Sequence, residues 1–321
     1  LSPLNSLLIM VNDSFWVESY YEGYYRNRPQ NIKSASKSVL SALVGIALEE
    51  GFISSLDTTV AEVFPEYFVS HKMDSSWQKK ADITLRDLLM MSSGLRSTSG
   101  PEYGGWVMSS DWVKYALEQP LVGEPGRFME YSTGDSHIVS ALLTKCTGMS
   151  TYQFAQKYLF GPMEMICGGW QKSPKGIYFG GNNLALRPID LAHFGQLYLN
   201  GGRYKGKQVL SPEWAQESTQ PYRESRVSRD NGKLPYRYGY FWWNHNFGGY
   251  DTFFAWGYGG QYVFVIPDLE AVVVVTHRIL TSSKYGAYKQ QTYDLLENLI
   301  LPYIRSRRYL PVIEPIGASV R

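Results

Sequence analysis

The feature that most constrains this chain is a helix predicted for about residues 34–50 that has almost no polar face. Apolar side chains occupy nearly every side of its 3.6-residue repeat, and Gly51 follows as a stop signal. Other elements must cover such a helix on most sides, so we expect it at the centre of the fold. Its longest nearly apolar run, residues 39–48, is too short to span a bilayer.

Strand patterns occur near both ends of the chain. Residues 7–11 and 15–20 flank a turn at residues 12–14, which predicts an N-terminal hairpin. Strands return after residue 235 and precede a final helix at about residues 288–304. The later strands are predicted at residues 236–243, 252–256, 262–266 and 271–276.

Between these ends, the chain is predicted to consist of helices and loops. Thr84, Asp111 and Ser150 are placed to cap helix N-termini, and Gln153 completes a capping box with Ser150. Pro188 suits the first turn of a further helix. Repeats, heptad arrays and low-complexity tracts do not occur in the sequence.

The order of these elements predicts an α/β fold of the α+β type. We expect one antiparallel sheet assembled from both termini, flanked by helices, with an inserted all-helical domain. A length of 321 residues fits about two domains. The expected sheet domain combines residues 1–58 and 203–321, and the expected helical domain covers residues 59–202.

Composition and charge exclude several classes of function. Lys plus Arg number 31 against 29 Asp plus Glu, and this near-balance argues against nucleic acid or an anionic membrane surface as the main partner. Two cysteines, Cys146 and Cys167, exclude a disulfide scaffold and a cysteine-rich metal site. The five histidines lack H-E-x-x-H spacing, and G-x-G-x-x-G is absent, so neither a metal nor a dinucleotide cofactor is expected.

The sequence leaves the compartment and the oligomeric state open. The first residue is Leu1 rather than Met, which is compatible with the removal of a leader, so periplasmic, secreted and cytoplasmic locations all fit. The 25 Tyr and 9 Trp are also compatible with an aromatic-rich carbohydrate-binding protein. That interpretation gives no role to the serine and lysine described next.

The motif S-x-x-K occurs at Ser34 and Lys37, at the start of the apolar helix. A spacing of three residues puts both side chains on one helix face, with Cβ atoms about 5–6 Å apart. Burial lowers the pKa of a lysine amine, and a neutral amine can accept the proton of a serine hydroxyl. Ser34 is therefore either a nucleophile or a helix N-cap, and the motif alone does not decide between these roles.

The same spacing recurs at Ser76 and Lys79, so the motif by itself is not specific. Residues 71–82 are polar, and a lysine in such a stretch stays solvated and charged. The apolar helix, in contrast, can remove water from the amine of Lys37. Context therefore favours the first motif.

Two further segments contain candidate catalytic groups. Tyr131 and Thr133 precede a predicted helix, and a phenol beside a lysine can serve as a general base, although packing is the alternative role. Gly257, Gly259 and Gly260 lie between two predicted strands, where glycine lets the backbone approach another group closely. A strand-edge N–H there is a candidate oxyanion-hole donor, and a tight turn is the alternative.

Together, these three patterns resemble the β-lactamase-related serine hydrolases. This family includes class C β-lactamases, D-alanyl-D-alanine peptidases, related esterases and 6-aminohexanoate-oligomer hydrolases. The order of motifs matches: S-x-x-K at the start of a buried helix, then Y-x-N or Y-x-S, then a K-T-G-like strand near the C-terminus. The resemblance extends over about residues 5–305 and includes the stretches 88–95, 125–126 and 263–267.

The resemblance implies a β-lactamase/transpeptidase-like fold and a serine hydrolase that acts on a small-molecule ester or amide without a cofactor. Ser34 would attack the acyl carbon and form an acyl-enzyme, with Lys37 and Tyr131 as general base and acid. The backbone N–H groups of Ser34 and Tyr258 would form the oxyanion hole, since residues 255–257 align with K-T-G.

Two departures from the family pattern bear on the substrate. Ala255, Trp256 and Gly257 lack the lysine and threonine of K-T-G that hold a substrate carboxylate, and Thr133 replaces the asparagine of penicillin-active members. We therefore expect inefficient turnover of β-lactams and D-alanyl peptides, and an aromatic-walled site for esters or linear amides. The alternatives are a non-catalytic or slowly deacylating sensor on the same fold, and a hydrolase of β-lactams or D-amino-acid peptides.

Overall fold

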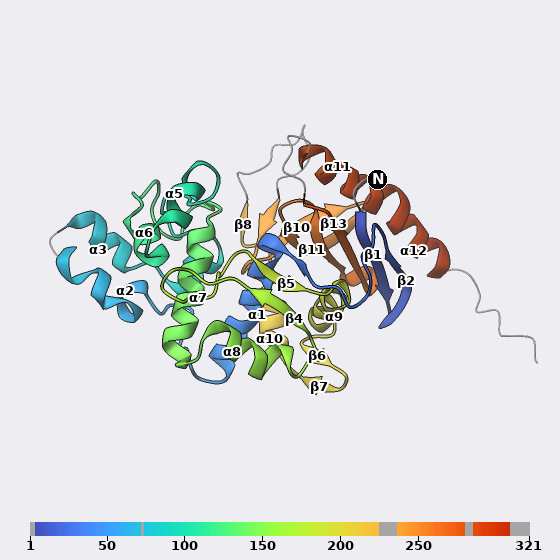
Figure 1. Ribbon diagram of the computed structural model, residues 1–321, viewed down its shortest axis with the longest axis horizontal. Helices are drawn as coiled ribbons and strands as arrows, with labels where there is room; N and C mark the ends of the chain where they lie inside the picture. The colour runs from blue at the N-terminus through green and yellow to red at the C-terminus, as the bar shows by residue number, and fades with distance from the viewer. Residues whose placement is uncertain (1–3, 72–73, 225–235, 280–284, 309–321) are drawn as a thin grey trace, which may run out of the picture.

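The computed structural model describes residues 4–71, 74–224, 236–279 and 285–308. Figure 1 shows two halves: a large antiparallel sheet with its covering helices, and a group of helices to one side. The predicted α+β class, with helices beside an antiparallel sheet, is confirmed.

Eight antiparallel strands form the large sheet: β1 Leu4–Val11, β2 Ser14–Tyr20, β8 Arg223–Glu224, β9 Arg237–Tyr238, β10 Trp243–Phe247, β11 Tyr250–Gly257, β12 Gln261–Ile266 and β13 Ala271–His277. Their order across the sheet is β2-β1-β13-β12-β11-β10-β9-β8. The N-terminal β1 pairs with the C-terminal β13, with Leu8 opposite Val274. The prediction of one sheet assembled from both termini is therefore confirmed.

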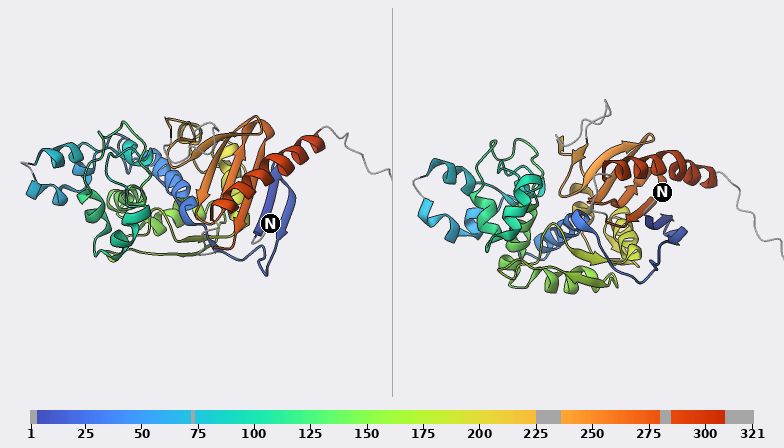
Figure 2. Two further views of the ribbon diagram at one scale, coloured as in Figure 1. Left: turned by 90° about the horizontal axis from the view of Figure 1, so that it is seen from above. Right: turned by 45° about the horizontal axis from the view of Figure 1, so that its top comes forward.

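Helices cover both faces of the sheet, as the right-hand view of Figure 2 shows. On one face lies α9 (Pro188–Leu199), so close that a Cβ on Gly195 would lie 2.6 Å from Val272. On the other face lies α11 (Tyr285–Leu295), whose Tyr293 ring is 5.0 Å from that of Phe247. Because both faces are covered, every residue of β12 and β13 is buried.

The apolar helix predicted near the N-terminus is α1 (Ser36–Glu49), and its residues from Ser36 to Ala47 are all buried. Trp214 packs so closely against it that a Cβ on Gly45 would lie 2.3 Å from the indole. The central position expected for this helix is confirmed. Its start differs from the prediction, because a 3-10 turn, η1 (Lys33–Ala35), precedes the α-helix.

The remaining helices lie mostly in the middle of the chain. The α-helices are α2 Val60–Val63, α3 Ser75–Ala81, α4 Leu85–Leu89, α5 Tyr103–Met108, α6 Trp112–Glu118, α7 Thr133–Thr147, α8 Thr151–Ala155, α10 Pro212–Glu217 and α12 Leu301–Arg308. Short 3-10 turns occur at Pro65–Tyr67, Val69–His71, Gly100–Glu102 and Pro267–Leu269, and π-helical turns at Gln156–Phe160 and Leu296–Ile300.

The predicted helix caps are confirmed. The side chain of Thr84 accepts the N–H of Asp87, that of Asp111 accepts the N–H of Lys114, and that of Ser150 accepts the N–H of Gln153. Each cap satisfies a backbone donor that has no partner inside its helix. These local rules explain why the sequence predicts the helices of this region well.

The middle of the chain also contains two strands that the sequence analysis did not predict. β4 (Cys167–Trp170) and β5 (Leu184–Leu186) form a small sheet with β3 (Gln30–Asn31), in the order β3-β5-β4. A further hairpin joins β6 (Arg203–Tyr204) and β7 (Lys207–Gln208). Since α9 packs on the large sheet, the domain boundary at residue 202 stays a prediction.

The strand predicted at residues 236–243 is wrong in part, because it is interrupted between β9 and β10. There the N–H of Phe241 donates to the carbonyl of Leu89, and the carbonyl of Phe241 accepts the hydroxyl of Ser38 at 2.7 Å. These backbone groups bond to helical segments instead of a neighbouring strand. Among the described residues, no helix is long and apolar enough to cross a membrane.

Candidate active site

A cleft of about 540 Å³ opens beside the N-terminal end of α1. Its volume lies in the range typical of small-molecule sites. Five of the residues singled out by sequence line it: Ser34, Tyr131, Thr133, Trp256 and Tyr258. Segments far apart in the sequence therefore meet at one place.

Ser34 lies in η1, two residues before α1 begins at Ser36. Its side chain caps neither η1 nor α1, because the residues at those positions are Ile32 and Ala35. The N-cap alternative for Ser34 is therefore wrong. Instead, the Nζ of Lys37 donates a hydrogen bond to the Ser34 hydroxyl at 3.2 Å.

Lys37 lies next to Ser34, the candidate nucleophile, and is only 2% exposed. Its Nζ also donates to the carbonyl of Gly181 at 2.9 Å, and none of the ion pairs between described residues includes Lys37. Burial lowers the pKa of Lys37 to about 7, while the charge of Asp135 acts in the opposite direction. Near neutral pH, a large fraction of the amine is therefore uncharged and able to accept a proton.

Asp135 is a second buried titratable group near this site, in the first turn of α7, and it is 1% exposed. Burial raises the pKa of its carboxyl to about 7, and the hydroxyls of Ser93 and Ser132 offset part of this increase. Those hydroxyls lie close by, yet in the described part of the chain neither carboxyl oxygen accepts a hydrogen bond of normal geometry. The sequence analysis missed Asp135, although an acidic residue on a predominantly buried helix was an available signal.

The ring of Tyr131 lies over the same amine, with Lys37 Nζ 5.0 Å from its centroid. Trp243 stacks on this ring at 5.5 Å, and Tyr238 meets it edge to face at 6.3 Å. These contacts fix the phenol at the cleft. The predicted meeting of hydroxyl, amine and phenol is therefore present in the structure.

Strand β11 passes directly against the turn that carries the serine. A Cβ on Gly257 would lie 2.2 Å from the carbonyl oxygen of Ile32, so only glycine permits this approach. Tyr258 follows at the cleft and is 45% exposed. The close backbone approach expected at Gly257 is found, while an oxyanion role for Tyr258 stays a prediction.

Ala255 and Gly257 do not line the cleft. Ala255 is 1% exposed and pairs with Val263 inside the sheet. Trp256 points into the cleft instead and gives it an aromatic wall together with Trp243. The apolar wall expected from the sequence is therefore present, built by Trp256 rather than by Ala255.

Several cleft residues were not predicted from the sequence. Lys33 precedes the serine, Ser99 accepts the N–H of Thr133 at 3.0 Å, and the side chain of Asn182 donates to the hydroxyl of Tyr103 at 3.0 Å. These residues come from loops whose positions depend on the tertiary fold. Only Lys33, next to the motif, was open to sequence reasoning.

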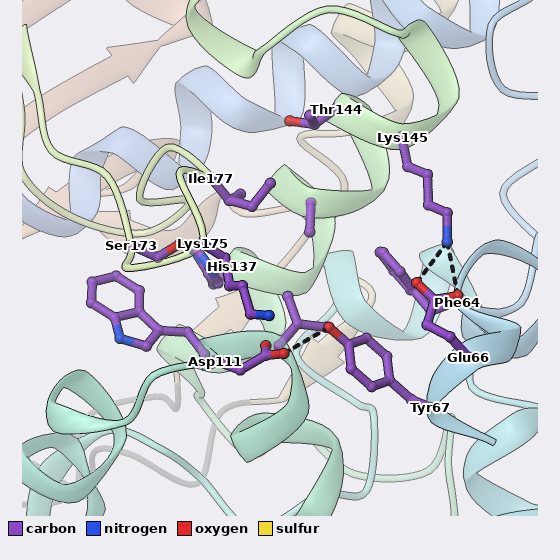
Figure 3. A pocket seen from close by; sticks show the side chains of 13 residues that line it. Phe64, Glu66, Tyr67, Asp111, His137, Thr144, Lys145, Ser173, Lys175 and Ile177 are labelled. Carbon is purple, nitrogen blue, oxygen red and sulfur yellow. Dashed lines mark hydrogen bonds and ion pairs between the residues drawn. The ribbon is translucent and has the colours of Figure 1, made fainter. Parts of the chain in front are cut away.

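A second, smaller pocket of about 290 Å³ lies in the helical half, and Figure 3 shows it. Three of its charged side chains interact with neighbours: Lys145 binds Glu66 at 2.8 Å, and Asp111 accepts a hydrogen bond from the hydroxyl of Tyr67 at 3.0 Å. None of the predicted site residues lines it. Among the described residues, no group of His, Cys, Asp or Glu is arranged to hold a metal ion.

Comparison with known families agrees with this geometry. The family model described as Beta-lactamase matches residues 6–296, and the chain belongs to that family. Its fold, with a large sheet and an adjoining helical group, is the β-lactamase/transpeptidase-like fold that the resemblance implied. Family and fold support serine hydrolase activity in general.

Solved structures share the fold at low sequence identity. A candidate 6-aminohexanoate-dimer hydrolase from Bacillus anthracis has a TM-score of 0.73 at 19% identity, covering 96% of this chain and 80% of its own. EstCE1, described as a hydrolase with promiscuous acyltransferase activity, has a TM-score of 0.72 at 15% identity, covering 91% and 93%.

A D-stereospecific amidohydrolase from Streptomyces sp. has a TM-score of 0.68 at 15% identity, covering 92% of this chain and 94% of its own. At such identities, the likeness establishes the fold and leaves the substrate open. A search of curated proteins found no match.

Proposed function

We propose that this protein is a serine hydrolase that cleaves carboxylic esters or linear amides through an acyl-enzyme on Ser34. The observation that carries the proposal is the buried amine of Lys37, 3.2 Å from the Ser34 hydroxyl, with a pKa lowered to about 7. A desolvated amine at hydrogen-bond distance from a hydroxyl is the arrangement that activates a serine nucleophile.

In the proposed reaction, the Oγ of Ser34 attacks the substrate carbonyl carbon while its proton passes to the neutral amine of Lys37. The carbonyl oxygen becomes an oxyanion, which accepts hydrogen bonds from the backbone N–H groups of Ser34 and Tyr258. Tyr131 then delivers a proton to the leaving oxygen or nitrogen as the bond to carbon breaks. Water then attacks the acyl-enzyme ester and gives a proton to the Tyr131 phenolate. The carboxylic acid leaves, and Lys37 returns its proton to the Oγ of Ser34.

The cleft walls support esters and linear amides as the reacting groups. Trp243, Trp256 and the rings of Tyr103 and Tyr131 give an aromatic surface on which an acyl or leaving group can pack. Apolar pockets discriminate weakly between chain lengths, so we expect broad specificity. The similar structures described as an amidohydrolase, a 6-aminohexanoate-dimer hydrolase candidate and a hydrolase with acyltransferase activity support the same choice.

The test is pre-steady-state kinetics with a short p-nitrophenyl ester. The wild type should release a burst of nitrophenolate equal to the enzyme concentration, and Ser34→Ala should lose both the burst and the turnover. Intact-mass spectrometry should find the acyl group on the wild type only. Undiminished turnover by Ser34→Ala would end the proposal, and a lasting adduct without turnover would favour the slowly deacylating sensor.

A substrate panel separates the reaction classes. p-Nitrophenyl esters, a linear aminohexanoate amide and a cephalosporin should be compared by kcat/KM. We expect the cephalosporin to be the poorest of the three, because Ala255 and Trp256 stand at the two positions where the family pattern has the lysine and threonine that hold the carboxylate of a β-lactam. A cephalosporin turned over as well as the esters would contradict the proposed substrate class.

A further inference from the structure

Lys33 is the one charged side chain among the described residues that line the cleft. The other lining groups are hydroxyls, one amide, glycine backbone and aromatic rings, and no Asp or Glu is among them. The cleft therefore presents a single positive charge against an otherwise neutral, largely aromatic surface. Such a surface attracts a ligand with one negative charge.

The backbone holds Lys33 in an unusual conformation. Its φ is +53°, in the left-handed region that residues other than glycine rarely adopt. The side chain of Asn31 accepts the Lys33 N–H at 2.8 Å, and the amide of Asn31 donates in turn to Asn183 at 2.7 Å. Backbone strain of this kind persists where the surroundings impose it, and it is frequent at ligand sites.

The base of the Lys33 side chain lies between the serine turn and β11. A Cβ on Gly257 would lie 3.1 Å from the Cβ of Lys33, so the strand and the lysine are in direct proximity. Since Ser34 is the next residue, Lys33 lines the cleft directly beside the candidate nucleophile. A group that it binds would lie close to the reacting carbonyl.

The amine of Lys33 has no acidic partner in the described part of the chain. None of the ion pairs between described residues includes it, and burial lowers its pKa. A partly desolvated ammonium gains more from an anion than a fully solvated one does, because less water has to be displaced. The opposite arrangement occurs at Lys145, which already binds Glu66 at 2.8 Å.

We propose that Lys33 anchors a carboxylate of the substrate, so that the preferred esters or amides are monoanions. This inference rests on the proposed function and adds the charge of the substrate to it. Lys33 is the one charged side chain among the described lining residues, and the amine of Lys289 lies behind the wall, 5.0 Å from the centroid of the Trp256 ring. A lysine without an arginine fork matches a carboxylate better than a phosphate dianion. The acyl or leaving group would pack on Trp256 while its carboxylate reaches the amine.

The test compares two esters that differ only in charge, 4-acetoxybenzoate and 4-acetoxybenzamide. The readout is the ratio of their kcat/KM values in the wild type and in Lys33→Met, since any intrinsic difference between the leaving groups cancels between enzymes. We expect the ratio to fall about tenfold or more in Lys33→Met, as for loss of a hydrogen bond to a charged group. Lys33→Arg should restore most of the preference for the carboxylate.

Lys207→Met is the matched control, because Lys207 is an exposed lysine on β7 outside the cleft. Its ratio should equal that of the wild type. Raised salt should reduce the preference of the wild type and leave that of Lys33→Met unchanged. An equal ratio in the wild type and Lys33→Met, with both folded by circular dichroism, would overturn the inference.

A binding experiment keeps this inference distinct from the proposed function. Calorimetry with 4-acetamidobenzoate and 4-acetamidobenzamide, in a Ser34→Ala background, measures the anchor without turnover. We expect the carboxylate to bind about tenfold more tightly only while Lys33 is present. Binding without ester hydrolysis by the wild type would reject the proposed function alone, whereas hydrolysis without charge preference would reject the anchor alone.

Discussion

The chain contains the S-x-x-K spacing twice, and the two copies lie in opposite environments. Ser34 and Lys37 stand at the central helix, where the lysine is 2% exposed and donates to the serine hydroxyl. Ser76 and Lys79 stand on α3, where the lysine side chain is 55% exposed and binds Glu124 at 2.7 Å. The same spacing therefore gives a serine–lysine hydrogen bond at the buried copy and a lysine–glutamate ion pair at the exposed copy.

This difference shows what the four-residue pattern leaves unspecified. On α3, Asp74 caps the helix by accepting the N–H of Ser76 at 2.8 Å, so that segment is an ordinary solvated helix. At the central helix, no side chain caps the start, and the serine hydroxyl faces the cleft. The partners of the serine and the lysine therefore depend on what surrounds the motif.

The largest difference in activity is expected when each of the two lysines is replaced in turn. Lys37→Met should lower kcat/KM for a p-nitrophenyl ester by about 10²–10⁴-fold, the usual value of a general base. Lys79→Met should change kcat/KM less than twofold, because the amine of Lys79 lies on the protein surface, where it binds Glu124. Stopped-flow and steady-state kinetics on both variants provide the measurement, and comparable losses in the two would break the comparison.

A smaller loss of catalytic activity is expected when Gly181 is replaced by alanine. A Cβ on Gly181 would lie 2.7 Å from Lys37 Nζ and 2.3 Å from the hydroxyl of Ser136, so Gly181→Ala should displace the amine. We expect kcat/KM to fall by about tenfold or more, in keeping with the sensitivity of catalysis to misplacement.

The control for that variant is Gly104→Ala. A Cβ at Gly104, in α5, would meet nothing within 4 Å, and alanine favours a helix. Activity should stay at the wild-type level there. A Gly181→Ala enzyme with full activity and an unchanged melting temperature would show that the position of Lys37 tolerates this displacement.

The pH dependence of activity should report the protonation of Lys37. Since burial lowers the pKa of Lys37 to about 7, kcat/KM should rise with pH through about 7 as the amine loses its proton. The Asp135 charge raises the Lys37 pKa, so Asp135→Asn should move this acidic limb to lower pH. A limb that moves to higher pH would contradict the assignment.

Asp135→Asn should also change the pH dependence of stability. The folded pKa of Asp135 is about 7, above its ordinary value, so its contribution is greatest at low pH and is lost as pH rises through about 7. The variant should therefore gain stability relative to the wild type above neutral pH. Urea unfolding at pH 5 and pH 8 measures this gain, and an equal difference at both would refute it.

The smallest effect is expected at Tyr258. Its proposed role uses the backbone N–H, so Tyr258→Ala should alter KM more than kcat, with kcat changing less than about fivefold, well below the loss of an oxyanion donor. A fall of kcat by 10² or more would mean that the side chain itself takes part in the chemistry. The p-nitrophenyl ester assay provides both constants.

Local signals made much of the fold predictable. The caps at Thr84, Asp111 and Ser150 and the N-terminal hairpin follow from short-range rules, and the structure has each of them. The spacing of Ser34 and Lys37 also follows from helix geometry. Each of these features depends on residues within a few positions of one another.

The missed features depend on contacts between distant residues. The carbonyl of Gly181 accepts a hydrogen bond from Lys37, 144 residues away in the sequence, and β3 pairs with β5 over a similar sequence separation. The cleft position of Lys33 follows from a left-handed backbone that Asn31 and β11 impose, which no propensity of lysine predicts. The prediction of a continuous strand at residues 236–243 was wrong for the same reason, since the N–H of Phe241 donates a hydrogen bond to the carbonyl of Leu89 in the helical half.

The contact between Gly257 and Ile32 has a consequence for the order in which the protein becomes active during synthesis. The serine emerges from the ribosome early, yet the strand that lies against it comes more than 200 residues later, and β13 must follow before the β1–β2 hairpin can join the rest of the sheet. Pairings of such long range form late and slowly. Under the proposed mechanism, a nascent chain carries Ser34 through most of translation without a finished catalytic centre, and hydrolysis begins only when the C-terminal strands have been released.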